Sequence, residues 1–287
     1  MSMLPAGWQR YRFEMICLLP FLLYLGFFTI VPLAQVFWLG FSDGAGGVTL
    51  AHMRRLWAQP DFMQAFRNTL VIALGSLALE VLLGLMLALA LSALGRRGGW
   101  LRTIFILPLA VPTVVAAVMM TYLFATSGWI NRILMDLGLI SQNIVWLSGD
   151  ARSLFAVMVA DCWKVTPLVM LILLAGLQGI DQQLYQAAEV DGANVLQRFL
   201  HITLPLLLPA ITAAMIVRGI DAFRIFDLAL VLTGENLKVI GTYAYLAYSE
   251  YQDLALSAAS SVVLFGMIFV AIVLHLRLMG RRGFEAA

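Results

Sequence analysis

The sequence predicts an all-α membrane protein with six transmembrane helices, and two observations support this prediction. Hydrophobic residues make up 62% of the 287 residues and charged residues only 12%, whereas a soluble chain is roughly half apolar and a quarter charged. In addition, six segments reach the length of about 20 mostly apolar residues that is needed to cross a bilayer. Because lipid offers no hydrogen-bond partner to free backbone groups, we expect all six to be helical.

The six predicted spans belong to one transmembrane domain that covers residues 1–287. An even number of spans places both termini on the same side of the membrane. Arginines gather in the short segments on that side, at Arg96, Arg97 and Arg102 and in the tail Arg277–Arg282, so the positive-inside rule predicts that both termini are cytoplasmic. The predicted spans are residues 15–39, 69–94, 103–125, 154–177, 204–232 and 258–279.

Several classes of function find no support in the sequence. The net charge of +2 and the lack of a basic run argue against nucleic acid as a partner. There is no phosphate-binding glycine loop, so the chain is not expected to bind a nucleotide or another cofactor itself. The three histidines lie in separate segments and the two cysteines are far apart, so we expect no metal site, no disulfide and no catalytic residues.

A polar segment, residues 181–205, separates the fourth predicted span from the fifth. Asp181 is suited to cap a short helix, and Gly192 tolerates the backbone angles of a tight turn. Pro205 suits the first turn of the next membrane helix. The segment, called loop 181–205 below, is therefore predicted to be a rigid helix–turn–helix outside the bilayer. Its second helix has an apolar stripe at Val195, Leu196, Phe199 and Leu200.

Ionisable residues inside the predicted spans are costly, and they therefore indicate function or tight pairing. Arg218 with Asp221, and Arg224 with Asp227, have the i, i+3 spacing at which helical neighbours neutralise each other. The alternative is that Arg218 and Asp221 line the wall of a cavity. Glu80 has no cation nearby in the sequence and is either protonated or paired across helices. Asp161 and Lys164 lie one turn apart, just before Pro167.

Three loops on the outer side are longer than simple connectors, at residues 42–68, 127–152 and 233–252. The first contains a predicted amphipathic stretch at residues 53–66. The second has apolar residues at helical spacing, which predicts a short helix at Trp129–Leu134. The many tyrosines and tryptophans in these loops are typical of an interfacial belt, and a docking rim for an external partner is the alternative.

Loop 181–205 resembles the coupling (EAA) loop of ATP-binding-cassette importer permeases. The spacing of Gln186-Ala187-Ala188, Gly192 and Ile202-Thr203-Leu204-Pro205 matches the family pattern, although Gln186 replaces the usual glutamate. The segment Glu235-Asn236-Leu237 replaces a glycine-rich turn of the family. The resemblance is to the maltose and sugar branch and extends over nearly the whole chain. It is also seen in the segments Leu18–Phe41, Leu107–Val115, Asp161–Leu168 and Phe223–Gly234.

This resemblance implies a permease subunit that forms half of the pathway for a sugar, oligosaccharide or polyol in a bacterial inner membrane. The implied partners are a second permease, two ATPase subunits that bind ATP-Mg, an extracytoplasmic solute-binding protein and membrane lipid. The implied ATPase-coupling residues are Tyr185, Gln186, Ala187, Ala188, Asp191, Gly192, Ala193 and Pro205. The implied substrate-pathway residues are Thr113, Asp161, Lys164, Asp221 and Ala222.

Two other classes of function remain as alternatives. A self-sufficient secondary carrier would use the buried charges for ion coupling, but the chain shows no pair of broken helices in matching halves. A membrane enzyme would need a constellation of catalytic groups, which the scattered histidines do not provide.

Overall fold

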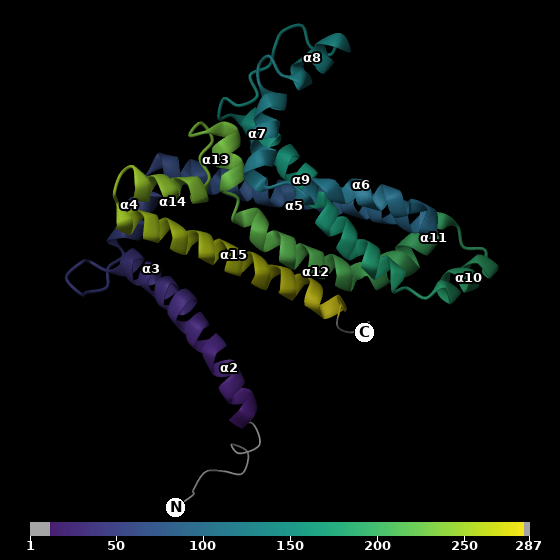
Figure 1. Cartoon of the computed structure of the whole chain (residues 1–287), viewed down its shortest axis with the longest axis horizontal. Helices are drawn as coiled ribbons and strands as arrows, with labels where there is room; N and C mark the ends of the chain where they lie inside the picture. Colours follow the sequence, from purple (N-terminus) through teal and green to yellow (C-terminus); the bar gives the residue numbers. More distant parts are fainter. Residues whose placement is uncertain (1–11, 284–287) are drawn as a thin grey trace, which may run out of the picture. The chain divides into compact units, whose positions relative to one another are not determined.

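The computed structural model describes residues 12–283 and contains helices but no named strand in that range (Figure 1). The chain divides into two compact units, which are described separately. One comprises Met1–Ala58 with Ala244–Val263, and the other Gln59–Tyr243 with Leu264–Ala287. The prediction of a single permease domain over residues 1–287 includes residues 1–11 and 284–287, which lie outside the described part. That prediction stays untested.

Six segments of the described chain are long and apolar enough to cross a membrane, which confirms the predicted number of spans. The first, second, fourth and sixth overlap the predicted spans, but the second begins at Pro60 rather than Thr69. Proline is favourable in the first turn of a helix because its missing N–H has no partner there. The six segments are Glu14–Phe41, Pro60–Leu94, Thr113–Asp136, Ala151–Gln178, Val195–Phe223 and Leu254–Arg277.

The third predicted span, residues 103–125, is wrong as a single helix. The structure has two helices there, α6 (Gly99–Ala110) and α7 (Thr113–Phe124). Pro112 causes the break, because it cannot donate a backbone hydrogen bond and it forces the residue before it out of the helical region. Val111 is accordingly extended, with φ −74° and ψ 129°.

The fifth predicted span, residues 204–232, ends too late. Helix α12 (Leu204–Phe223) stops at Phe223, and a separate helix, α13 (Asp227–Thr233), follows. Phe226 has φ −140° and ψ −69°, which no α-helix contains. No glycine or proline lies at this break, so the sequence has no helix-breaking residue there.

The unit Met1–Ala58 with Ala244–Val263 contains α2 (Arg12–Leu25), the π-helix η1 (Gly26–Ile30), α3 (Val31–Phe41) and α4 (Ala51–Trp57). Gly40 of α3 lies against the backbone of Ala259, where an added Cβ would be in ordinary van der Waals contact. Arg55 of α4 forms an ion pair with Asp253 at 2.8 Å. The predicted amphipathic stretch 53–66 includes the end of α4 at Trp57 and the start of the next helix at Pro60.

The core of the other unit is built around α5 (Pro60–Leu94) and α9 (Ala151–Gln178). Gly84 permits their close approach, since a Cβ there would lie only 2.8 Å from Val169 Cγ1. Helix α12 packs on both, and Gly176 of α9 lies against Ala210 of α12 in the same way. The remaining elements of the described chain are η2 (Gly95–Gly98), α8 (Trp129–Asp136), α10 (Gln182–Val190), α11 (Val195–Arg198), η3 (Phe199–Thr203), α14 (Ile240–Ser249) and α15 (Leu254–Gly283).

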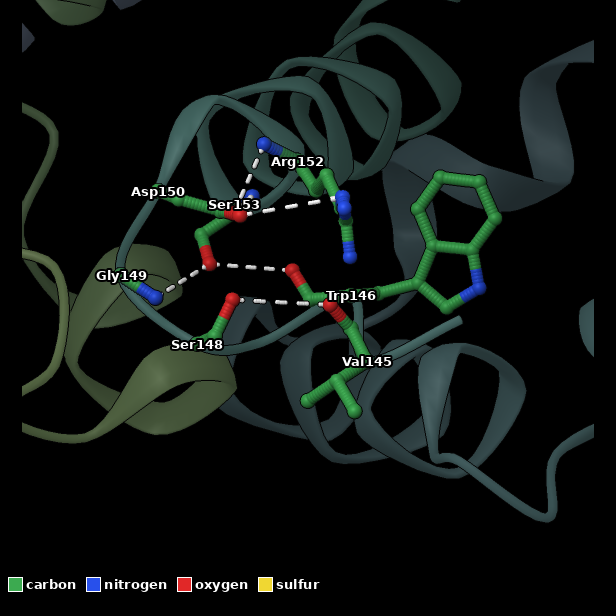
Figure 2. Close-up of polar contacts among 7 residues, drawn as sticks. All are labelled: Val145, Trp146, Ser148, Gly149, Asp150, Arg152 and Ser153. Carbon is green, nitrogen blue, oxygen red and sulfur yellow. Dashed lines mark hydrogen bonds and ion pairs between the residues drawn. The ribbon is translucent and has the colours of Figure 1, made fainter. Parts of the chain in front are cut away.

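The predicted short helix at Trp129 is confirmed as α8. Its buried Asn131 donates to the backbone oxygens of Thr126 and Ile144 and accepts from Trp146 Nε1 at 3.0 Å. Figure 2 shows the adjoining turn, in which Asp150 caps α9 by accepting from the backbone N–H of Arg152 at 2.9 Å. These contacts fix the segment that leads into α9.

Candidate functional site

The first half of loop 181–205 forms as predicted. Asp181 caps α10 by accepting a hydrogen bond from the backbone N–H of Gln183 at 2.9 Å. The helix ends at Val190, and Gly192 just beyond its cap has a φ of +76°, the left-handed conformation that favours glycine. The N–H of Ala193 then donates to the oxygen of Ala188 at 2.9 Å, which closes the turn.

The second half begins with a reciprocal cap that the sequence reasoning missed. The backbone N–H of Gln197 donates to Asn194 Oδ1 at 2.9 Å, and the backbone N–H of Asn194 donates to Gln197 Oε1 at 2.8 Å. The signal for this capping box was present, because a capping residue and a glutamine lie three positions apart. From this cap the chain stays helical through α11, η3 and α12 as far as Phe223.

One hydrogen bond and one ion pair connect the two halves of the loop. The hydroxyl of Tyr185 lies 3.0 Å from Thr203 Oγ1, which joins α10 to η3. Glu189 and Arg198 are 3.7 Å apart across the turn, and an exposed pair of this kind contributes at most about 1 kcal/mol. The loop is therefore a helix–turn–helix that is braced by contacts between its own two halves.

Loop 181–205 exposes apolar side chains on both sides of its turn, although most of its exposed residues are polar. Val190 is 88% exposed and Val195 is 73% exposed. A hollow beside the turn is lined by Ala188, Asp191, Gly192 and Ala193, which are four of the predicted coupling residues. The other four are Gln186 and Ala187, which are exposed on α10, Tyr185, which is half-buried, and Pro205, which is exposed at the start of α12.

A second candidate site is a buried charge cluster, which consists of Glu80 on α5, Asp161 on α9 and Arg218 on α12. Arg218 donates to both carboxylate oxygens of Glu80, with its Nε 2.6 Å and its Nη2 3.0 Å away. The same Nη2 also donates to Asp161 Oδ2. The three residues are 0%, 7% and 2% exposed, respectively. Two carboxylates thus share one guanidinium, and this contact joins three membrane helices.

The cluster corrects the predicted pairing of the membrane charges. Arg218 pairs with Glu80 and Asp161 rather than Asp221. Arg224 and Asp227 are exposed and form no ion pair within residues 12–283. The reason is geometric: Glu80 and Asp161 come from neighbouring helices and enclose the guanidinium from two sides. Of the alternatives for Glu80, pairing across helices is confirmed.

The predicted substrate-pathway residues lie in two kinds of surroundings. Asp221 is exposed, and Lys164 and Thr113 are half-buried. Asp161 is held by Arg218, and Ala222 is buried in an apolar cluster with Ala73 and Phe223. Their role in a pathway stays a prediction. Asp161 and Lys164 differ in their contacts: Asp161 pairs with Arg218, whereas Lys164 forms no ion pair in the described part of the chain.

Six apolar segments, two of them joined by a braced polar loop, define a multi-pass membrane protein. The family described as "Binding-protein-dependent transport system inner membrane component" matches residues 80–280. The chain is 36% identical to the trehalose/maltose transport system permease protein MalF of Thermococcus litoralis, over 91% of each chain. It is 30% identical to the arabinooligosaccharides transport system permease protein AraP of Bacillus subtilis, over 91% of this chain and 86% of the relative.

The chain therefore belongs to the family of inner-membrane components of binding-protein-dependent, ATP-binding-cassette transport systems. A bacterial transporter that imports the acidic polysaccharide alginate has the same fold, with a TM-score of 0.84 and 23% identity over 96% of this chain and 97% of that one. The MetNI methionine transporter is a more distant match, with a TM-score of 0.57 and 16% identity over 76% of this chain and 94% of that one. Family membership does not favour the alternative of a secondary carrier.

Proposed function

We propose that this chain forms half of the membrane pathway of a sugar importer and takes a sugar, oligosaccharide or polyol from an extracytoplasmic binding protein. The names of its relatives support this substrate class, since they transport trehalose and maltose or arabino-oligosaccharides. Hydroxyl-rich solutes suit carboxylates such as Asp221, which is exposed on α12 and accepts hydrogen bonds. Thr113, Asp161, Lys164 and Ala222 are the other proposed pathway residues.

In this proposal, loop 181–205 couples the permease to a cytoplasmic ATPase. The single observation that carries the proposal is the combination of a braced turn with exposed apolar side chains. Val190 and Val195 expose apolar side chains to solvent. Burial of such surface against a partner stabilises a complex by about 25 cal/mol per Å². The bracing by Tyr185 and Thr203 matters equally, because a loop that deforms easily would not transmit a displacement.

The proposed assembly contains a second permease, two ATPase subunits with ATP-Mg and the binding protein. The chain has no nucleotide-binding glycine loop of its own, which is why hydrolysis is assigned to a partner. Both termini and loop 181–205 lie in the cytoplasm in this proposal, in keeping with the arginines near Arg102 and Arg277.

Replacement of Gly192 by proline tests the coupling. Proline fixes φ near −65°, whereas Gly192 has φ +76°, and it also removes the N–H that donates to Glu189. We expect Gly192→Pro to insert into the membrane normally but to lose more than about 90% of sugar uptake. ATP hydrolysis by the assembled complex should no longer respond to the loaded binding protein. Uptake and ATPase activity in proteoliposomes measure both effects.

The matched control is Gly138→Pro. Gly138 also ends a short helix, with φ +69° and the same three closing hydrogen bonds, and both glycines have open space around them. Because Gly138 lies beyond α8, far from loop 181–205 in the sequence, this variant should keep uptake and coupling. Wild-type transport in Gly192→Pro, or equal losses in the two variants, would exclude loop 181–205 as the coupling element.

A further inference from the structure

The buried charge cluster of Glu80, Asp161 and Arg218 calls for an explanation other than stability. Removing charges from water costs several kcal/mol per ion, and the attraction between them often only offsets that cost. Replacement of such a cluster by apolar residues of similar size is often neutral or stabilising. Ionisable groups within membrane spans therefore usually serve a function. Two acids and one base also meet in a place with almost no exposure to water.

The two contacts of Arg218 are unequal. Glu80 is held by two hydrogen bonds and its side chain is fully buried. Asp161 is held by one nitrogen, and its side chain is 10% exposed. Breaking one contact at a partly exposed carboxylate costs less than breaking a bidentate contact in the interior. Glu80 is thus suited to be the permanent partner of Arg218, and Asp161 the partner that can be released.

Close contacts at two glycines join α9 to each of the other two helices. Helices α5 and α9 touch at Gly84, where no side chain larger than hydrogen fits. Helix α12 touches α9 at Gly176, where a Cβ would lie 2.6 Å from Ala210 Cβ and 2.9 Å from Leu207 Cδ1. The Gly176 contact lies near the start of α12, between loop 181–205 and Arg218. Arg218 follows Ala210 by about 12 Å along the helix, at about 1.5 Å per residue.

Because the chain is helical without interruption from Val195 to Phe223, α12 connects loop 181–205 directly to Arg218. A tilt of this helix about the contact at Gly176 would move Arg218 in the opposite direction to the loop. Of the two contacts that resist such a tilt, the one to Asp161 consists of a single hydrogen bond.

We propose that the Arg218–Asp161 contact is a latch: it holds the resting conformation, and it opens when a displacement of loop 181–205 tilts α12, which frees the carboxylate of Asp161 for the solute pathway. This inference rests on the proposed function, because it assigns a regulatory contact to the same transporter. Arg218 is a positioning residue in this scheme. In this scheme Glu80 of α5 stays bound to Arg218 throughout the cycle, so Arg218 remains between the helices when the latch is open.

The substitution Asp161→Asn tests the latch. An amide fills the same space and can still accept a hydrogen bond, but without the charge it holds Arg218 less strongly. We expect the assembled complex to hydrolyse ATP without binding protein or solute about fivefold faster than wild type, since a weaker latch raises the population of the open state. A role in packing alone would lower activity or stability and would not raise this basal rate.

Asp227→Asn is the matched control, because Asp227 is an exposed carboxylate of the same unit outside the cluster and the proposed pathway; it should leave the basal rate unchanged. Arg218→Lys is the second variant, since a lysine keeps the charge but cannot reach both carboxylates as a planar fork does, and it should raise the basal rate as well. An unchanged basal rate in both Asp161→Asn and Arg218→Lys would overturn the latch. If Gly192→Pro still uncouples the complex, the proposed function stands.

Discussion

The two ends of the unit Gln59–Tyr243 are built in opposite ways. At the end where α9 begins, hydrogen bonds join residues that are far apart in the sequence. Asn68 donates to the oxygen of Lys238 at 2.9 Å, and the N–H of Ile240 donates to Thr69 Oγ1 at 2.9 Å. At the other end, the hydrogen bond and the ion pair that connect the two halves of loop 181–205 join residues no more than 18 positions apart. The first end is completed by the chain itself, and the second is left open to a partner.

The helix ends at Gly138 and Gly192 show that local structure alone does not account for this difference. Both glycines have positive φ and the same pattern of closing hydrogen bonds. Yet α8 is anchored to the following segment by its own Asn131, which is 1% exposed. In contrast, α10 has no buried residue. In Figure 1, α10 and α11 lie at the end of α9 that is remote from α8. The two turns therefore differ in their tertiary contacts: the helix before Gly138 is anchored to the chain by a buried side chain, and the helix before Gly192 is exposed.

The largest expected effect is on stability at the closed end. Asn131→Ala removes the partner of the Trp146 indole N–H and of two backbone oxygens. Buried polar groups without partners cost about 1–3 kcal/mol each, so we expect the free energy of unfolding to fall by about 3 kcal/mol. Thermal unfolding of the purified protein in detergent measures this loss. The same change at Asn194, an exposed cap of α11, should cost about 1 kcal/mol or less; equal losses would contradict the comparison.

A smaller effect is expected on binding at the open end. Val190→Ser replaces an exposed apolar side chain, so the free energy of unfolding should change by less than about 0.5 kcal/mol. The affinity of the permease for its ATPase should fall about tenfold, which corresponds to about 1.4 kcal/mol of lost apolar contact. A binding titration with permease in lipid nanodiscs measures this change. Val48→Ser, at a valine that is 77% exposed in the other unit, should leave the affinity unchanged.

The smallest effect concerns the pH dependence of the cap shown in Figure 2. Slight desolvation raises the pKa of Asp150, but the hydrogen bond from the backbone N–H of Arg152, those from Ser148 and Ser153, and the Arg152 charge together lower it below its ordinary value. A lowered pKa means that the ionised cap stabilises the fold above the unfolded value, and that this contribution is lost as the pH falls through the folded value. The wild type should therefore lose more thermal stability than Asp150→Asn between pH 6 and about pH 3. Identical pH profiles for the two proteins would show that the ionised cap contributes nothing.

Much of the fold was predictable because its signals are local. The count of six spans follows from apolar length, and the caps at Asp181 and Gly192 follow from residue type. The third span was wrong because a run of apolar residues concealed the effect of Pro112. The end of α12 at Phe223 had no marker in the sequence.

The buried charge cluster could not have been predicted from the sequence. Glu80 and Arg218 are 138 positions apart, and only the packing of α5 against α12 brings them together. The expected partner, Asp221, lies one turn from Arg218, and the local rule therefore favoured it. Burial decides against the local pair, because Arg218 is buried while Asp221 remains exposed.

Gly84 has a consequence for how this chain can change. It lies one turn beyond Glu80 on α5, against Val169 and the backbone of Met170. A single added methyl group there would act as a wedge between α5 and α9, because the nearest atoms are only 2.8 Å and 3.1 Å from the site of a Cβ. The carboxylate that Arg218 reaches across 2.6 Å would shift with the helix that bears it. The absence of a side chain at Gly84 thus sets the position of Glu80 relative to Arg218.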